Sequence, residues 1–393
     1  MTRRQSIAQI LLAPQFAAAQ TTPPDAAASS NQFGLKLAVE LAAAHPDKNV
    51  FISPLSIFLA LAMTGNGAAG KSKAAIWSTL ALRPNVTDDQ LNASIAALTK
   101  LLDSQKGVQL SIANALWASL AFQFSKDYAA RCEAAFQAKV TTLDFAKPDA
   151  APTINKWVSE KTGGKIPEIV SASGVRNAAV ILTNAIYFRG KWDNPFEKSQ
   201  TQAKSFHLAA GHVKEVPMMR NRYLHLAYRA TATCESAELQ YQNASIAMQV
   251  LLPKAGHTSA SVLRTLDWQA LRKQPTTADL DLSLPRFTLD FSDTLARPLK
   301  KMGMEIAFKN PPADFTPMGS KDFFIGDVIH KTRLEVDEEG TIAAAATAVM
   351  MVGAAAPMKR EKKTLVFDKP FVVLLYETTT GALLFAGLVQ EPK

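Results

Sequence analysis

The chain has 393 residues, of which 48% are hydrophobic and 20% are charged, and its formal net charge is +9. This balance is typical of a soluble globular protein with a large core, and it excludes collagen-like and largely unfolded chains. The basic residues are mostly dispersed, so we predict no nucleic-acid partner. No apolar run reaches the roughly eighteen residues that a membrane-spanning helix needs, so we predict no membrane insertion.

The N-terminal segment has the layout of an export signal. A basic start is followed by a mildly apolar stretch, residues 7–19, which contains Pro14 and ends in three alanines before Gln20. This order is typical of a secretory signal peptide, and Arg3-Arg4 is also a weak match to a twin-arginine signal. We therefore expect a signal peptide and a disordered Ala/Thr/Pro-rich spacer over residues 1–30, and a secreted protein, extracellular or periplasmic. The alternative is the frayed tail of a cytoplasmic protein.

The rest of the chain is predicted to be one domain, residues 31–393, because no Pro/Gly/Ser-rich linker or internal repeat interrupts it. Residues 31–45 have helical periodicity and end at Pro46. A second helix is expected soon afterwards, because Ser53 is a good N-cap and Pro54 suits the first helical position.

Residues 65–72, GNGAAGKS, match the G-x-x-x-x-G-K-[ST] pattern of phosphate-binding loops. Such a loop binds phosphate through backbone N–H groups at a helix start, and it must follow a buried strand. Here Ser53 and Pro54 predict a helix before it, so a nucleotide-binding protein is only a remote alternative. The glycines are better explained as a turn between two helices.

Further helices are predicted near residues 88–103 and 126–136, with a strand at residues 108–117 between them. Residues 178–189 are an apolar run that predicts a central strand buried on both faces, and its one polar interior residue, Asn184, needs hydrogen-bond partners. Residues 282–289 alternate as one further strand that contains Arg286.

The sequence contains no catalytic constellation. It has no G-x-S-x-G or H-E-x-x-H motif, and its six histidines lack metal-ligand spacing, so we predict neither an enzyme nor a metal or cofactor site. The two cysteines, Cys132 and Cys234, lie far apart in sequence; one disulfide is possible in principle, but two buried free thiols are favoured.

The most unusual stretch is residues 338–356, EEGTIAAAATAVMMVGAAA, which has no charge after Glu339 and almost no large side chain before Val349. An exposed loop normally carries Asn, Asp, Ser and Pro, and a core strand carries larger residues. Small uncharged residues throughout suit a segment that is first a loop and later a buried strand, with Gly340 as its hinge. A helix or a simple alanine-rich linker is the alternative. Residues 323–337 before it and 364–377 after it, broken at Pro370, are predicted as strands.

This order of a strand, Glu-Glu-Gly-Thr-x-Ala-Ala-Ala-Ala-Thr, a variable stretch and then Phe-Asp-Lys-Pro-Phe resembles the serpins, and residues 365–375 fit the C-terminal signature of that family. The resemblance extends from about Asn31 to the end of the chain. It implies an α+β serpin fold: a large central mixed or antiparallel β-sheet, smaller sheets, about eight or nine helices, and an exposed reactive-centre loop over about residues 338–362.

The resemblance also assigns site residues, by position. The loop hinge comprises Glu338, Glu339, Gly340, Thr341, Ala343, Ala345 and Thr347. A polar cluster that holds the sheet closed yet separable comprises Ser53, Ser56, Asn184 and His330. An upper gate through which the loop enters the sheet comprises Trp192, Arg286, Lys331 and Glu338.

The family's activity is suicide inhibition. By resemblance, a serine protease, or alternatively a cysteine protease, attacks the loop and forms a covalent acyl-enzyme. The cleaved loop then inserts into the central sheet and traps the protease before water releases it. A monomer is the family's default state. Non-inhibitory members that act as carriers, storage proteins or chaperones are the alternative, although residues 341–347 keep the inhibitory pattern.

The family's usual spacing from Glu338 places the reactive bond between Ala354 and Ala355, within a residue or two. A small residue on the acyl side suits elastase-like or subtilisin-like proteases, whereas a register moved to Met351 would suit a chymotrypsin-like one. The basic cluster Lys359, Arg360, Lys362 and Lys363 is a candidate exosite, although a solvated strand edge is the favoured interpretation. Heparin activation through the helix at residues 88–103 is not expected, because only Lys100 and Lys106 lie in or beside it.

Overall fold

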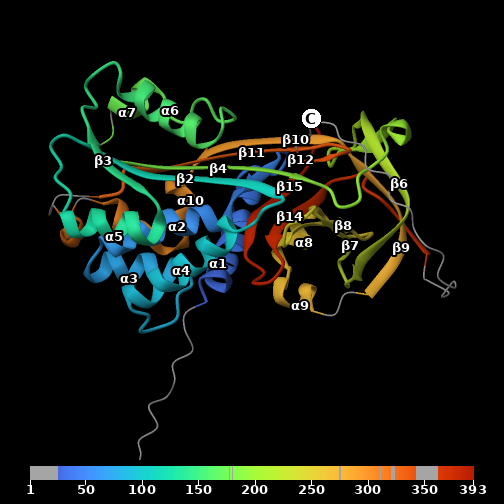
Figure 1. Ribbon diagram of the computed structural model, residues 1–393, viewed down its shortest axis with the longest axis horizontal. Helices are drawn as coiled ribbons and strands as arrows, with labels where there is room; N and C mark the ends of the chain where they lie inside the picture. Colours follow the sequence, from blue (N-terminus) through green and yellow to red (C-terminus); the bar gives the residue numbers. More distant parts are fainter. Residues whose placement is uncertain are drawn as a thin grey trace, which may run out of the picture.

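The computed structural model describes residues 25–176, 178, 180–273, 276–309, 311–319, 324–341 and 362–393 (Figure 1). The α-helical segments are α1 (Ala26–Ala44), α2 (Pro54–Asn66), α3 (Gly70–Thr79), α4 (Asp88–Asp103), α5 (Lys126–Phe136), α6 (Ala150–Lys161), α7 (Ala172–Arg176), α8 (Ser259–Arg264), α9 (Trp268–Arg272) and α10 (Ala296–Leu299). Short 3-10 or π segments are η1 (Lys198–Gln200), η2 (Lys300–Met304), η3 (Glu305–Phe308) and η4 (Thr316–Met318). The described residues thus form slightly more helices than the eight or nine expected, because several are single turns.

The strands form two sheets. The six-stranded sheet contains β10 (Phe287–Thr294), β11 (Asp327–Val336), β4 (Val180–Lys191), β2 (Val108–Ser119) and β3 (Lys139–Leu143) in that order, and β12 (Gly340–Thr341) pairs with β4. The nine-stranded sheet contains, in order, β1 (Val50–Ile52), β15 (Leu383–Val389), β14 (Phe371–Glu377), β8 (Ile246–Pro253), β7 (Cys234–Gln240), β6 (Val213–Ala230), β9 (Thr276–Pro285) and β13 (Lys362–Val366), and β5 (Gln202–His207) pairs with β6. The predicted α+β class with a central mixed sheet is confirmed.

Two neighbour pairs in the six-stranded sheet run parallel: β2 with β3 and, at the centre of the sheet, β11 with β4. β11 and β4 run parallel, with Asp327 beside Ile181 at one end of their register and Arg333 beside Tyr187 at the other. On their outer sides β11 pairs antiparallel with β10, and β4 pairs antiparallel with β2. The pairing of β11 with β4 ends at Arg333, three residues before β11 itself ends.

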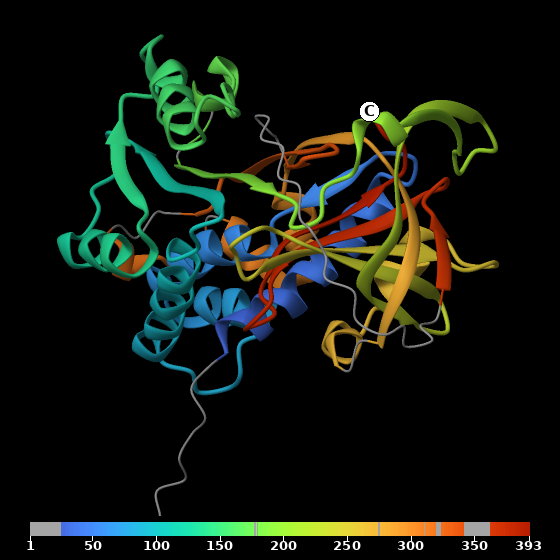
Figure 2. The same cartoon turned by 45° about the vertical axis from the view of Figure 1, so that its right-hand side comes forward.

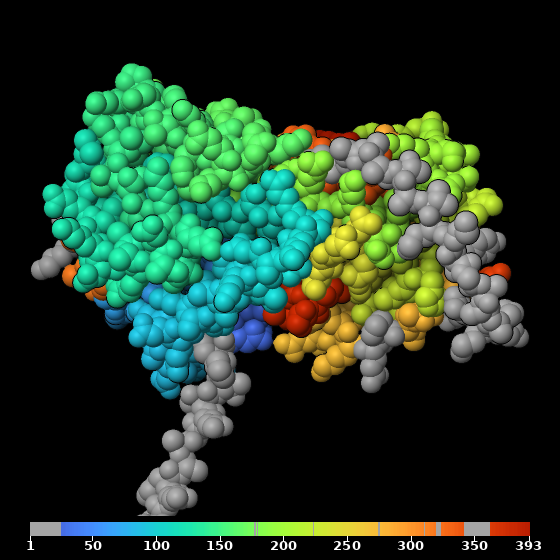
Figure 3. All heavy atoms as spheres, in the orientation of Figure 1, coloured from blue at the N-terminus to red at the C-terminus, as the bar shows by residue number. Residues whose placement is uncertain are grey.

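Helices cover both faces of this sheet. α6 and α7 lie on one face, where Ile154 and Val158 pack in a separate hydrophobic cluster with Trp117 and Ile181 of the sheet. Figure 1 shows α6 and α7 above the sheet and the N-terminal helices below it. In Figure 3 the region of α6 and α7 is the raised green lobe at the upper left.

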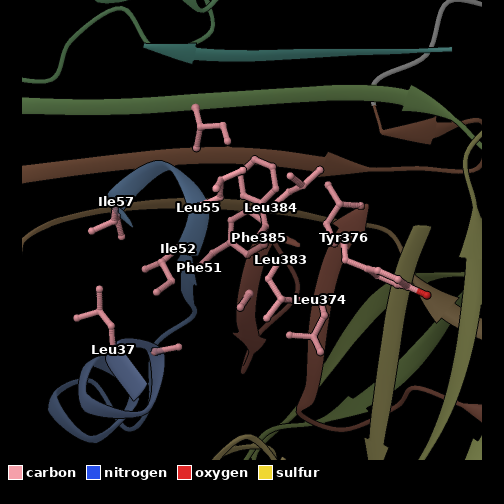
Figure 4. Packing of buried hydrophobic residues seen from close by; sticks show 14 of the residues in the cluster. Leu37, Phe51, Ile52, Leu55, Ile57, Leu374, Tyr376, Leu383, Leu384 and Phe385 are labelled. Atoms are coloured by element: carbon pink, nitrogen blue, oxygen red, sulfur yellow. The ribbon is translucent and has the colours of Figure 1, made fainter. Parts of the chain in front are cut away.

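The main core lies on the opposite face, between the two sheets. α2 is buried along its whole length. Figure 4 shows Leu37 of α1, Ile57 of α2 and Phe385 of β15 gathered below the six-stranded sheet, and Phe385 stacks on Phe51 with ring centroids 5.0 Å apart. Figure 2 shows how β14 and β15 run through the middle of the molecule beside these helices.

Several predicted elements are confirmed. α4 and α5 have the predicted bounds, and β2 and β4 each run two residues past their predicted ends. Ser53 caps α2, since its hydroxyl accepts a hydrogen bond from the Ser56 N–H at 3.2 Å, and Pro54 is its first residue. Cys132 and Cys234 are both buried free thiols.

The predicted spacer over residues 20–30 is wrong at its C-terminal end, because α1 begins at Ala26 and not at Asn31. Asp25 caps the helix by accepting a hydrogen bond from the Ala28 N–H at 3.0 Å. Ala26, Ala27 and Ser30 are buried. The small residues Ala26, Ala27 and Ser30, which suggested a spacer in the sequence, instead pack closely in the first turns of a core helix.

The single strand predicted over residues 282–289 is also wrong. The chain changes sheets at Arg286, so residues before it belong to β9 and residues after it to β10. Pro285 has no N–H to continue a ladder, and the Arg286 N–H donates to the Pro217 carbonyl at 2.8 Å. Alternation of polarity continues through the break, which is why the pattern alone did not reveal it.

Candidate functional site

The first residues of the predicted loop already lie in the six-stranded sheet. Gly340 pairs antiparallel with Lys191, and Thr341 pairs with Gly190, just beyond the point where β11 and β4 separate. Gly340 has φ +151°, and a Cβ atom on it would lie 2.2 Å from the Gly190 carbonyl oxygen. Only glycine fits a position with both this backbone conformation and this close approach. The predicted hinge position therefore requires glycine for steric reasons.

Thr341 is completely buried. Its hydroxyl lies 2.7 Å from the Tyr241 hydroxyl. Burial raises the pKa of Tyr241, so this phenol stays neutral at physiological pH. Tyr241 in turn stacks on Trp192, with ring centroids 4.5 Å apart. The start of the loop is thus held by the hydrogen bond between Thr341 and Tyr241, and Trp192 supports the Tyr241 ring by stacking on it.

The predicted gate lies directly above this hinge. The Arg286 guanidinium contacts the Glu338 carboxylate at 2.6 Å, and the Thr201 hydroxyl donates to the same carboxylate at 2.6 Å. Burial would raise the pKa of Glu338, but the hydrogen bonds from Arg286 and Thr201 hold it below its usual value. The carboxylate is therefore ionised although its side chain is only 2% exposed.

Trp192 fixes the chain on the other side of the gate. Its backbone N–H donates to the Glu339 carbonyl at 2.9 Å, and its indole N–H donates to the Asp337 carbonyl at 3.0 Å. Burial raises the pKa of Asp337, although the N–H groups of Glu339 and Gly340 donate to its carboxylate. Trp192 therefore holds Asp337 and Glu339, while Gly340 and Thr341 pair with β4.

Lys331 does not belong to the gate. It lies in the middle of β11, beside Ala185 of β4, and its ammonium donates to the Glu168 carbonyl at 3.1 Å. Five residues of extended strand, at about 3.3 Å each, separate it from Val336 at the gate. The structure therefore brings Trp192, Arg286 and Glu338 together but not Lys331.

The four residues of the predicted polar cluster meet below the gate, where β11, β4 and the start of α2 come together. Asn184 is at its centre: its side-chain N–H₂ donates to the Ser56 hydroxyl, and its side-chain oxygen lies 2.5 Å from His330 Nδ1. The other imidazole nitrogen, Nε2, accepts a hydrogen bond from the Ser53 N–H at 3.1 Å. All four residues are completely buried.

Burial lowers the pKa of His330 to about 3. The imidazole is therefore neutral, with Nδ1 protonated toward Asn184, since Nε2 accepts the Ser53 N–H. The cluster is uncharged as a whole. It links the two central strands to each other and to α2 by hydrogen bonds without an ion pair that would be costly to break.

One member of this cluster was missed in the sequence. Asn114 of β2 lies beside Asn184 and accepts a hydrogen bond from its side-chain N–H₂ at 2.5 Å, while the Asn114 amide nitrogen has no partner. A lone asparagine within a mostly apolar strand is the same signal that identified Asn184. The sequence could not show that the two lie opposite each other, because 70 positions separate them.

Other predicted residues lie outside the described part of the chain. These are Ala343, Ala345, Thr347, Ala354, Ala355, Lys359 and Arg360. Of the candidate exosite, Lys362 and Lys363 begin β13, and the Lys363 ammonium lies 5.8 Å from the centroid of the Tyr228 ring.

The phosphate-loop alternative is contradicted by the fold. Residues 65–72 connect α2 to α3, so a helix and not a strand precedes the glycines. The Ser72 hydroxyl accepts a hydrogen bond from the Asp314 N–H at 2.9 Å instead of facing a ligand. Among the described residues no group of His, Cys, Asp or Glu is arranged to hold a metal ion, and none of the described helices is long and apolar enough to span a membrane.

Comparison with known proteins agrees with this geometry. Residues 28–392 match the family model described as Serpin (serine protease inhibitor). The chain is 32% identical to the human leukocyte elastase inhibitor, over 93% of this chain and 98% of that protein, and 34% identical to the leukocyte elastase inhibitor of Xenopus laevis, over 88% and 93%.

Solved structures give the same result. The native thermophilic serpin tengpin matches with a TM-score of 0.81 at 27% identity, over 91% of this chain and 93% of that one. A thyroxine-binding globulin in complex with thyroxine matches with a TM-score of 0.83 at 25% identity, over 93% and 99%. The match of residues 28–392 to the family model, together with relatives of 32–34% identity over most of the chain, shows that the chain belongs to the serpin family of serine protease inhibitors.

Proposed function

We propose that this serpin traps a serine protease with a shallow apolar primary pocket, elastase-like or subtilisin-like, as a covalent acyl-enzyme. The reactive bond is Ala354–Ala355. The observation that carries the mechanism is the position of Gly340 and Thr341, which already occupy the first two places of a new strand next to β4. The identity of the small residues at the bond supports the target class, as do the printed names of the relatives, leukocyte elastase inhibitors.

The register of β12 specifies where the loop would go. Each later loop residue pairs with a β4 residue one position earlier, so Thr347 comes to lie opposite Asn184, and Met351 comes to lie opposite Val180, where β4 begins. On the face of the buried Thr341 side chain then lie Ala343, Ala345 and Thr347, because side chains alternate along a strand. Insertion therefore parts the polar cluster when Thr347 reaches it.

The energy of insertion is large enough to trap a protease. A strand of about twelve residues gains about as many backbone hydrogen bonds, which at about 1 kcal/mol net each gives on the order of 10 kcal/mol. This is comparable to the stability of a typical protease, so the inserted loop can hold the active site of the protease distorted. A cysteine protease would be trapped in the same way, since it also forms an acyl-enzyme.

The test is incubation of the protein with an elastase, a subtilisin and a chymotrypsin. Denaturing gel electrophoresis should reveal a covalent complex, and mass spectrometry of the released peptide should find Ala355 at its N-terminus. A complex with chymotrypsin alone, and a peptide beginning at Val352, would move the reactive bond to Met351. Cleavage by all three proteases with no complex would identify a non-inhibitory serpin instead.

We also propose that the protein is exported. Support comes from the basic start, the apolar stretch at residues 7–19 and the alanines before Gln20. Protein recovered from the medium or periplasm of its own cell should begin near Gln20 by N-terminal mass spectrometry. Recovery only from the cytosol, with the first residues intact, would contradict export.

A further inference from the structure

Tyr241 belongs to the nine-stranded sheet side of the molecule, yet its backbone is fixed to the end of β4. It directly follows β7, which ends at Gln240. The Asp193 N–H donates to the Gln240 carbonyl at 2.9 Å, and the Gln242 N–H donates to the Lys191 carbonyl at 2.8 Å. Both sequence neighbours of Tyr241 are therefore bonded to the chain at or just after the end of β4, independently of the loop.

The ring of Tyr241 is fixed as well. It packs edge-to-face on Phe188, with ring centroids 4.8 Å apart, in addition to its stacking on Trp192. A Cβ atom on Gly190 would lie 2.6 Å from Tyr241 Cδ1, so the ring occupies the space that a side chain at position 190 would need. Gly190 is the residue of β4 that pairs with Thr341. The ring therefore lies beside the place where the loop enters the sheet.

The hydroxyls of Tyr241 and Thr341 form an isolated buried pair. They lie 2.7 Å apart, and the two residues are 2% and 0% exposed. Within the described part of the chain, neither hydroxyl has another hydrogen-bond partner. Removal of one hydroxyl would therefore leave the other buried and unsatisfied, whereas removal of both by residues of the same shape can be nearly neutral.

The position of the hinge matters after cleavage, when insertion of the loop competes with hydrolysis of the acyl-enzyme. Forming the first residues of a strand fixes backbone dihedrals before later hydrogen bonds compensate the loss of conformational entropy. Because Gly340 and Thr341 already pair with β4, this first step is complete before a protease arrives. The fraction of molecules whose hinge is paired therefore sets how often insertion precedes hydrolysis.

We propose that Tyr241 is a positioning residue for inhibition: its hydroxyl holds Thr341 in the sheet and thereby favours trapping of the protease over release of cleaved inhibitor. This inference rests on the proposed function, and it adds a residue from outside the loop and outside the six-stranded sheet. Tyr241 acts on the partition after acylation and not on the attack itself, because the proposed reactive bond lies well beyond Thr341 in the sequence.

The first test is the variant Tyr241→Phe, with whichever of the three proteases forms a covalent complex with the wild type. The ratio of cleaved inhibitor to complex should rise at least about threefold, which corresponds to one buried hydroxyl left without its partner. The rate at which the protease attacks the loop should stay at the wild-type value. Tyr128→Phe is the matched control, because it removes a completely buried phenol hydroxyl that donates to the Met63 carbonyl, and it should keep the wild-type ratio.

The second test separates the hydroxyl pair from general support of the fold. Thr341→Val should raise the ratio as Tyr241→Phe does, and the double variant should return toward the wild type, because neither hydroxyl is then left unsatisfied.

A double variant no better than the single ones would overturn the proposal. Single variants that lower Tm but keep the wild-type ratio would also overturn it, since Tyr241 would then serve only the fold. Failure of the wild type to trap any protease would instead refute the proposed function.

Discussion

Single side chains at the hinge decide whether the loop can enter the sheet. Thr341 is completely buried and its hydroxyl is satisfied by Tyr241. Glu338 is ionised in a nearly buried position, where Arg286 and Thr201 supply its hydrogen bonds. The two positions differ in their tolerance of charge, because a charge is acceptable at Glu338, where Arg286 and Thr201 are its partners, and not at the buried Thr341.

The variant Thr341→Arg should convert the inhibitor into a substrate. A guanidinium at this place has no acidic partner, and its burial would cost several kcal/mol, so insertion should slow below the rate of deacylation. The expected result is cleavage of the loop by elastase with little or no covalent complex on a denaturing gel.

The matched control is Thr294→Arg, an exposed threonine at the edge of the same sheet, which should inhibit like the wild type. Undiminished complex formation by Thr341→Arg would show that the loop does not insert from this position.

The variant Arg286→Met should destabilise the protein by about 1–3 kcal/mol near neutral pH, because it leaves a buried carboxylate with one partner fewer. The folded-state pKa of Glu338 is lowered, so its favourable contribution is present above its unfolded value and is lost as the pH falls through the folded value. Chemical denaturation at several pH values should therefore find that the difference from wild type shrinks in acid.

Lys309→Met is the control for Arg286→Met. It removes one partner of an ion pair whose side chains are 56% and 63% exposed, and such pairs contribute about 0–1 kcal/mol. A loss as small for Arg286→Met as for Lys309→Met would mean that Glu338 does not depend on its guanidinium partner.

His330 should make unfolding sensitive to mild acid. Its pKa is about 3 when folded and near its ordinary value of 6.5 when unfolded, so between these values the unfolded chain binds more protons and stability falls as the pH falls. Between pH 7 and 4 the free energy of unfolding of the wild type should decline more steeply than that of His330→Asn. The exposed His257, changed to Asn, should leave the wild-type slope intact; an equal slope in all three proteins would contradict a neutral buried imidazole.

Among the elements, β12 is especially informative, because Gly340 and Thr341 define the direction and register in which this part of the chain pairs with β4. Most individual elements could be predicted from the sequence: a serine cap with a following proline gives α2, and an unbroken apolar run gives β4. The pairing of distant strands could not. Arg286 ends one sheet and begins the other, and Asn114 meets Asn184 only because β2 and β4 are neighbours. The resemblance assigned Lys331 to the gate, whereas in the structure Lys331 lies in the middle of β11, beside Ala185.

The variant Tyr241→Phe should loosen β12 without disturbing the sheet around it. It removes one hydroxyl and leaves the Thr341 hydroxyl buried without its partner, at a cost of about 1 kcal/mol or more. Hydrogen exchange measured by mass spectrometry should become faster in peptides that contain residues 340–341. Tyr187→Phe, which changes a buried tyrosine of β4 below the hinge, should not alter exchange there; faster exchange in both variants would indicate a general loosening of the sheet.

For the whole molecule, the folded state with an intact loop should be less stable than the cleaved state with its loop inserted. A gain on the order of 10 kcal/mol in a chain of this length corresponds to a rise in Tm on the order of 10 °C. Calorimetry of the protein before and after cleavage by a protease that leaves no complex measures this directly. Thr341→Arg is the internal control, since its cleaved form should gain much less; an unchanged Tm for the cleaved wild type would exclude insertion.

The parallel pairing of β11 with β4 has a consequence for the direction in which this protein changes. A strand that enters between them in the register of β12 runs antiparallel to both. The one parallel pairing, with slanted hydrogen bonds, is then replaced by two antiparallel pairings with perpendicular hydrogen bonds. Antiparallel pairing is slightly more stable per residue. The sheet is therefore unfinished at its centre. On the proposed mechanism, cleavage by a protease would supply the further strand that separates β11 from β4.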